Sequence, residues 1–261
     1  MSQIPLRDDP TRPAFGGPRL LERALVAISF TPITRIATDP ELVSMLQERL
    51  RHSYPFFRRQ ADPTMRVDLS PAGEVSMSRD EAISWHFADA EKGRSISLTQ
   101  DLIAFDVREQ SYDTWPSFID AAREIFKHFA DVMAPSHVVR QGVRYLNTGK
   151  VGGKKDPRSF CARELTSVSG SEDLELSDLM WHFNVEEGRM LLRNGLMPEN
   201  ASYDPSFFQP REEKTWYLDI DVFGSDFVPF DIDRIMDSLF QQAKRLHAVY
   251  YWAMTREDEK S

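Results

Sequence analysis

Residues 113–135 read DTWPSFIDAAREIFKHFADVMAP and predict the clearest helix of this 261-residue chain. Asp113 or Thr114 can cap its first N–H groups, and Pro116 suits the first turn because that turn needs no N–H there. Pro135 ends the helix. Apolar residues recur at helical spacing: Phe118, Ala122, Ile125, Phe129 and Val132. The sequence therefore predicts a helix that buries one continuous face.

Two more helices are predicted, one on either side of this one. Asp39 followed by Pro40 provides an N-cap and a proline at the first helical position, and Asp231 caps the last helix. The first helix has its apolar stripe at Val43, Leu46 and Leu50, and the last has it at Ile235, Leu239, Ala243, Leu246 and Tyr250. The three main helices are therefore expected at 40–52, 115–133 and 231–254.

Short apolar or alternating runs occupy most of the remaining chain and predict antiparallel strands. They lie at 25–30, 65–69, 74–78, 83–88, 95–99, 102–108, 138–147, 179–185, 190–193 and 215–223. Turn residues such as Gly73 and Gly93 separate neighbouring runs. The expected fold class is therefore α+β, with antiparallel sheets packed against the three main helices.

The tripeptide Trp-His-Phe occurs twice, at 85–87 and at 181–183, and each copy is followed by Gly-Arg and a returning strand. The order of one helix followed by several strands also occurs twice. A duplication would explain both observations, and chance identity over three residues is the alternative. We expect a single α+β domain over 21–255, which a duplication would divide into pseudo-duplicated halves at 21–110 and 111–255.

The composition excludes several classes of protein. The formal net charge is -9, the pI is near 5.2 and the mean hydropathy is -0.45. An acidic chain repels polyanions, which disfavours nucleic acid as a partner. No run approaches the roughly 20 apolar residues that cross a bilayer, so no membrane partner is expected. Cys161 is the only cysteine, which excludes an intramolecular disulfide and a multi-cysteine zinc site.

Both ends of the chain are expected to be loosely held. Residues 1–20 contain four prolines and no apolar stretch behind basic residues, so they predict a mobile tail and no secretion signal. Residues 256–261 are mostly charged and are expected to fray. The expected location is the cytoplasm.

The most distinctive segment reads Arg-Gln-Gly-Val-Arg-Tyr-Leu-Asn at residues 140–147. In a strand, Arg140, Gly142 and Arg144 share one face, and the Cα atoms of the two arginines lie about 13 Å apart. Gly142 leaves room for an approaching group, and two guanidinium groups suit a carboxylate or a phosphate. This face is therefore a candidate anion site.

A structural role is the alternative for the same arginines. Asp219 and Asp221 lie two residues apart in a predicted strand, so they share one face and can pair with the arginines. The glycine would then admit a packed helix. Tyr145 and Asn147 point to the opposite face of their strand. The candidate ligand-binding residues are Arg140, Gly142, Arg144, Tyr145, Asn147, Asp219 and Asp221.

No strong catalytic motif accompanies these residues. Asp219 and Asp221 lack the Glu-x-Lys or histidine pair of a metal-dependent nuclease, so a metal site has little support. The loop at 149–155 resembles a phosphate loop, but Thr148 stands where its first glycine belongs and Lys155 where its Ser or Thr belongs. Nucleophile-elbow, dinucleotide and zinc-helix motifs are missing. No cofactor, metal or catalytic residue is therefore predicted.

The histidines have mainly structural interpretations. His86 and His182 each stand between a tryptophan and a phenylalanine, so alternation turns them away from the buried aromatic side chains. His247 lies beside the apolar stripe of the last helix. Its position predicts a semi-buried, hydrogen-bonded histidine rather than a catalytic one.

The chain resembles a sporadically distributed, uncharacterised bacterial family of about this length, whose core motif is Arg-x-Gly-x-Arg-Tyr-x-Asn. The residues that match this core are Arg140, Gly142, Arg144, Tyr145 and Asn147. Further matches are Tyr54-Pro55, Tyr112-x-x-Trp115-x-x-Phe118, Leu218-Asp219-Ile220-Asp221 and Leu246-His247. The patchy distribution implies mobile loci, such as defence or toxin–antitoxin-like cassettes. The resemblance implies no activity, cofactor or catalytic residue.

Two functions follow as hypotheses. The first is a non-enzymatic binding or adaptor protein that acts through a protein partner encoded beside it. It rests on the lack of a catalytic motif and on a structural explanation for each polar cluster. The alternative is an enzyme or sensor that binds an anionic small molecule or a nucleic-acid end through Arg140 and Arg144.

Overall fold

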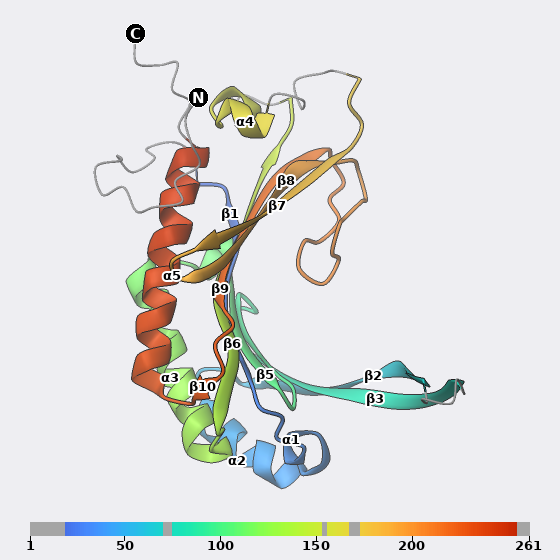
Figure 1. Cartoon of the computed structure of the whole chain (residues 1–261), viewed down its shortest axis with the longest axis vertical. Coiled ribbons are helices and arrows are strands. Elements are labelled where there is room, and N and C mark those ends of the chain that lie inside the picture. Colours follow the sequence, from blue (N-terminus) through green and yellow to red (C-terminus); the bar gives the residue numbers. More distant parts are fainter. Residues whose placement is uncertain (1–18, 70–74, 153–155, 167–172, 255–261) are drawn as a thin grey trace. The chain divides into compact units, whose positions relative to one another are not determined.

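In the computed structural model, the structure describes residues 19–69, 75–152, 156–166 and 173–254 (Figure 1). The predicted tail at 1–20 lies almost wholly outside these ranges, and the predicted frayed end at 256–261 lies wholly outside them.

Helices and antiparallel strands follow one another along the described residues. The helices are α1 (Arg35–Thr38), α2 (Pro40–Leu50), α3 (Trp115–Met133), α4 (Arg163–Thr166) and α5 (Ile232–Ala253). The strands are β1 (Leu21–Phe30), β2 (Phe56–Leu69), β3 (Val75–Ala88), β4 (Arg94–Leu98), β5 (Leu102–Arg108), β6 (His137–Lys150), β7 (Ser177–Val185), β8 (Gly188–Met197), β9 (Thr215–Gly224) and β10 (Val228–Pro229). They form a sheet in the order β2-β3-β4-β5-β1-β6-β9-β8-β7, with β10 paired to β6. The predicted α+β fold is confirmed.

The three main helices lie where the apolar spacing predicts them. α3 spans the predicted residues, and the Thr114 hydroxyl accepts the N-cap hydrogen bond from Ser117 N at 3.4 Å. Ala134 adopts a left-handed conformation (φ 46°) that ends the helix before Pro135. α2 ends at Leu50, two residues earlier than predicted, because the chain turns at 51–53.

The chain forms two compact units. The first comprises residues 1–26, 141–225 and 233–261, and the second comprises residues 27–140 and 226–232. β1 and β6 each contribute residues to both units.

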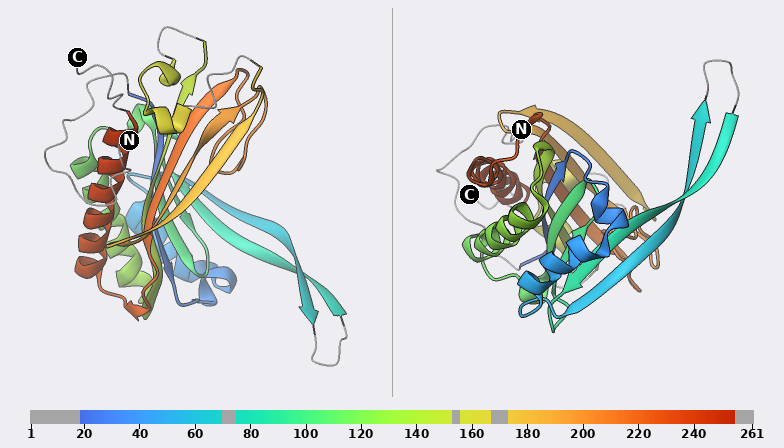
Figure 2. Two further views of the ribbon diagram at one scale, coloured as in Figure 1. Left: turned by 45° about the horizontal axis from the view of Figure 1, so that its top comes forward. Right: turned by 90° about the horizontal axis from the view of Figure 1, so that it is seen from below.

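In the second unit, β2 and β3 pair over 14 residues each and project as a two-stranded ribbon (Figures 1 and 2). This differs from the prediction, which divides β3 into strands at 74–78 and 83–88 and starts β2 at Met65. Within β3, only Trp85–Ala88 pairs with β4, so the earlier part of β3 has β2 as its one neighbouring strand. A ribbon of two strands buries neither face fully, which is why its sequence is too polar to be recognised as one strand.

In the first unit, α5 lies along one face of β6 and β9 (Figure 2). The apolar side chains Val143, Ile220, Val222 and Leu246 are all buried. The connection between β8 and β9 contributes to a separate buried cluster formed by Leu146, Met197, Phe207, Phe208 and Tyr217. Since Leu146 and Val143 alternate along β6, both faces of this strand are covered.

The order of elements repeats along the chain. A strand, one or two short helices, a set of strands and a long helix appear as β1 to α3, and then again as β6 to α5. In both sets the first strand neighbours the last long one, because β1 lies next to β5 and β6 lies next to β9. These sets cover residues 21–133 and 137–253, so their boundaries differ from the expected halves at 21–110 and 111–255. The duplication itself stays a prediction.

Candidate functional site

Arg144 forms an ion pair with Asp219 inside the first unit. Its Nε and Nη2 atoms donate to Oδ1 and Oδ2 of Asp219 at 2.9 and 2.6 Å. Residue 144 stands opposite Asp221 in the β6–β9 register, so the pair with Asp219 runs diagonally across two strands. The Asp219 side chain is 0% exposed and that of Arg144 is 23% exposed. The geometry is that of a buried, bidentate structural pair.

Two aromatic side chains from the β8–β9 connection complete this arrangement. The Phe207 ring centroid lies 3.7 Å from the Arg144 guanidinium carbon, and the Tyr203 hydroxyl donates to Asp219 Oδ2 at 2.8 Å. Burial alone would lower the pKa of Arg144, but the hydrogen bonds and charge of Asp219 outweigh it and raise that pKa. Burial, together with Asp219, raises the pKa of Tyr203. Neither group is therefore suited to exchanging protons near neutral pH.

A second set with the same composition lies beside the first. Nε and Nη2 of Arg193 donate to the two oxygens of Asp178 at 2.7 and 2.5 Å, and the Tyr217 hydroxyl donates to the same carboxylate at 2.7 Å. The guanidinium carbon of Arg193 lies 3.9 Å from the Tyr203 ring centroid, and the Tyr203 and Tyr217 rings are 4.8 Å apart. This pair is more open to solvent, at 23% and 29% exposure.

Sequence reasoning did not find the second pair or the two aromatic residues of the connection. Asp178 and Arg193 stand on neighbouring strands of the β7–β8 hairpin, so a register prediction could have placed them near one another. Tyr203 and Phe207 lie in an irregular segment, and no spacing in the sequence indicates that it folds back over the arginines.

The nearest neighbours of Gly142 belong to the paired strand β9. A Cβ atom at this position would lie 2.8 Å from the Phe223 Cβ and 3.0 Å from the carbonyl oxygen of Val222. Both predicted explanations of this glycine stay predictions, and the structure adds a third, which is the close approach of β9. The close approach of β9 occupies the space that the missing side chain leaves.

We expect Gly142→Ala to lower the free energy of unfolding by about 1–3 kcal/mol, because the added methyl group must push apart two paired strands. Urea titration of the purified variant measures this loss. A stability equal to that of the parent would show that β9 can move away at little cost.

Of the remaining predicted residues, Asp221 lies opposite Arg144, and its charge contributes to the raised pKa of that arginine. Tyr145 and Asn147 lie on the opposite face of β6, where both are buried, and Asn147 donates to the carbonyl oxygen of Leu218 at 3.3 Å. Arg140 and Asp221 are half-buried, and Arg140 belongs to the second unit. Of the seven candidates, the hydrogen bonds bring together Arg144 and Asp219. Within the described residues, no group of three or more His, Cys, Asp or Glu side chains is placed to hold a metal ion.

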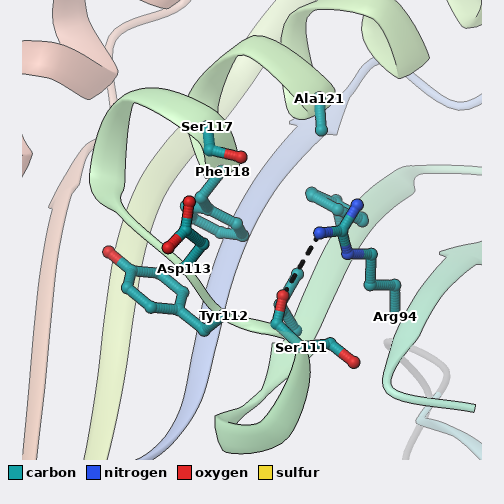
Figure 3. A pocket seen from close by; sticks show the side chains of 9 residues that line it. Arg94, Ser111, Tyr112, Asp113, Ser117, Phe118 and Ala121 are labelled. Atoms are coloured by element: carbon teal, nitrogen blue, oxygen red, sulfur yellow. Dashed lines mark hydrogen bonds between the residues drawn. The ribbon is translucent and has the colours of Figure 1, made fainter.

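A small pocket lies in the second unit, where β4 meets the start of α3 (Figure 3). It encloses about 190 Å³, counting space that is open to solvent. Ligand sites usually measure roughly 300–1,000 Å³, so this hollow is small for a substrate. Arg94 lines it, and one of its guanidinium nitrogens donates to the carbonyl oxygen of Ser111 at 3.3 Å. The pocket does not collect a set of catalytic groups.

Comparison with known proteins does not indicate a function for the Arg144 cluster or for this pocket. The chain matches no family model and no curated protein. The resemblance to a bacterial family therefore stays a prediction, and the function is argued from geometry. None of the helices in the described ranges has both the length and the apolar character that crossing a membrane requires.

Exposed apolar side chains gather at β7, the last strand of the sheet order. Leu176 precedes this strand and is 51% exposed, Leu179 is 41% exposed and Met180 is 52% exposed. Trp181 and Phe183 follow and are half-buried. Soluble proteins usually protect a sheet edge with lysine, proline or a covering segment. β7 contains neither lysine nor proline, which makes it the strongest candidate for a binding surface in the first unit.

Proposed function

We propose that this chain is a non-enzymatic binding protein that acts through a protein partner. The observation that carries the proposal is the apolar edge of the sheet at β7, with Leu179 and Met180 exposed. These two side chains point to opposite faces of the strand, and Leu179 shares its face with the half-buried Trp181 and Phe183. Exposed apolar side chains on a sheet edge are a common mark of protein–protein contact. In the mobile bacterial defence or toxin–antitoxin-like locus that the family resemblance implies, the partner would be encoded beside this chain.

The Arg144–Asp219 pair supports this choice over an anion-binding enzyme or sensor. Asp219 already accepts hydrogen bonds from two N–H groups of the Arg144 guanidinium. The Phe207 ring covers one face of that guanidinium. An incoming carboxylate or phosphate would have to share the guanidinium with Asp219 or displace it. Sharing sets two anions against one cation, and displacement leaves a buried carboxylate charged and unpaired, which is costly.

Co-purification of the tagged chain from its native host tests the proposal. We expect a stoichiometric protein partner with the parent chain and at least a roughly tenfold smaller recovery with Leu179→Glu, since apolar anchors dominate such interfaces. Phe240→Glu is the matched control, because Phe240 is exposed to a similar extent (44%) on α5. Recovery of no stoichiometric partner with the parent, or an equal loss with both variants, would contradict the proposal.

A further inference from the structure

The two Trp-His-Phe tripeptides occupy equivalent places in the sheet. Trp85 and Phe87 lie on β3 opposite Leu98 and Ile96 of β4. In the first unit, the equivalent aromatic residues of β7 lie opposite Leu192 and Met190 of β8. β4 and β8 in turn pair with β5 and β9, the strands that neighbour β1 and β6. β3 and β7 therefore occupy equivalent positions in two similar sets of strands.

These two strands differ in what covers them. β3 pairs with β2 on its far side. Phe57 of β2 stacks on Trp85 and packs at a tilt against Phe87, with ring centroids 5.6 and 4.9 Å away. Trp85 is 3% exposed and Phe87 is 0% exposed. No strand pairs with the far side of β7 among the described residues, and Trp181 and Phe183 are only half-buried. Within the part of the chain that the structure describes, the set around β7 thus has no counterpart of the strand that β2 supplies to β3.

The backbone of β7 is ready to pair on that side. A two-residue turn at Glu186 and Glu187 joins β7 to β8, so Val185 and Gly188 form the first hydrogen-bonded pair. Leu196 N points toward β7, where it donates to the Ser177 hydroxyl at 3.0 Å, which agrees with this alternation. The residues that direct N–H and C=O groups toward the open side are therefore Asp178, Met180, His182 and Asn184.

We propose that β7 accepts an extended strand from the protein partner, in the way that β3 accepts β2. This inference rests on the proposed function and specifies how the partner binds. The backbone of the added strand would pair with β7, and alternate side chains would cover Trp181 and Phe183. β2 provides the template, because it places Phe57 opposite Phe87 and Arg59 opposite Trp85.

Charge indicates which strand would fit. Asp173 and Glu175 precede β7 and Glu186 follows it, so an acidic side chain lies at each of its ends. Glu187 adds no free charge, because its carboxylate is paired with Arg245. Pairing of β7 with a second copy of itself would bring acidic ends together whether the strands ran parallel or antiparallel, and like charges facing one another are unfavourable. The acidic ends favour a partner strand with apolar residues at alternate positions and with basic residues, as in the Phe-Phe-Arg-Arg start of β2.

A synthetic peptide that copies residues 54–62 (YPFFRRQAD) is a suitable probe. At millimolar concentration we expect it to slow amide exchange at Met180 and His182 of the full chain at least fivefold, as followed by NMR. A control peptide that carries Phe57→Glu and Arg59→Glu should have no such effect. Protection that is confined to β2, or no protection at β7, would overturn the inference.

Met180→Pro tests the backbone contribution. Its N–H faces outward, so proline removes a donor to the added strand without breaking a bond to β8. We expect peptide binding at least tenfold weaker than in the parent, whereas Met180→Ala, which keeps the N–H, should stay within threefold. If Met180→Pro does not fold, the exchange measurement on the unmodified chain still decides the question. Sedimentation showing a dimer of the parent that Met180→Pro abolishes would identify a second copy as the occupant and overturn the inference.

The partner recovered from the native host separates this inference from the proposed function. If Leu179→Glu loses that partner and Met180→Pro retains it as well as Met180→Ala does, the strand addition is wrong and the proposed function stands. If the parent recovers no partner while the peptide still protects β7, the proposed function fails and the edge remains a strand acceptor.

Discussion

Arg144→Ala is expected to lower the free energy of unfolding by about 3–5 kcal/mol, which is the usual cost of breaking a buried ion pair. The substitution leaves Asp219 charged and 0% exposed, with the Tyr203 hydroxyl as its remaining donor among the contacts of this pair. The Phe207 ring also loses the cation that it covers. Equilibrium urea denaturation measures the loss, provided that the dependence on urea stays equal to that of the parent.

Arg193→Ala is the matched control for this prediction. Arg193 makes the same bidentate contact with Asp178 and lies over a tyrosine ring, but the Asp178 side chain is 29% exposed. Water can solvate the carboxylate that remains, so we expect a loss of about 1 kcal/mol. An Arg144→Ala variant as stable as the parent would contradict a structural role and return the arginine to the anion-binding alternative.

Periodicity in the sequence identifies the three main helices because each buries an apolar face, whereas the four-residue helices α1 and α4 are too short to show it. The apolar residues of α3 fall on one stripe, and Thr114 and Pro135 mark its ends through local backbone chemistry. Such signals act within a few residues of one another. The order of the strands in the sheet depends instead on pairings between distant residues, and no local pattern specifies them.

The β2–β3 ribbon and the connection over Arg144 are two features that local sequence patterns do not predict. Residues 75–84 contact one neighbouring strand only, so they need no continuous apolar pattern to form a strand. Tyr203 and Phe207 meet Arg144 only because β8 and β9 are adjacent and their connection folds back across them. Neither residue has a sequence neighbour that indicates this contact.

The candidate site was predicted in part for the same reason. Strand alternation correctly separates Tyr145 from Arg144, and the spacing of Asp219 and Asp221 correctly places a carboxylate within reach of the arginine. The alternation of side chains along β6 does not indicate which strand pairs with it. The close approach of β9 to Gly142 therefore has no signal in the sequence.

His247 provides the second large expected effect, a loss of stability in mildly acidic solution. The ring packs against Tyr145 and Tyr251, at 5.6 and 6.4 Å between ring centroids. Burial lowers the pKa of His247 to about 4, from an ordinary value of 6.5. The unfolded chain therefore binds a proton at this residue more readily than the folded chain does.

The sign of the effect follows from this difference in proton binding. Above pH 6.5 the histidine is neutral in both states, so its contribution is constant; between pH 6.5 and about 4 only the unfolded state gains the proton. The free energy of unfolding should therefore fall by roughly 3 kcal/mol over this interval, at about 1.4 kcal/mol for each pH unit.

The variant His247→Gln tests this prediction, because glutamine is polar but does not titrate. Carboxylates also titrate in this pH range, but they are the same in the parent and in the variant, so their effect cancels in the comparison. Urea titrations at pH 7 and pH 4 should show the parent losing roughly 3 kcal/mol more than His247→Gln. Equal losses in the two chains would mean that the folded protein accepts the proton at His247, and that its packing beneath Tyr145 is looser than the structure has it.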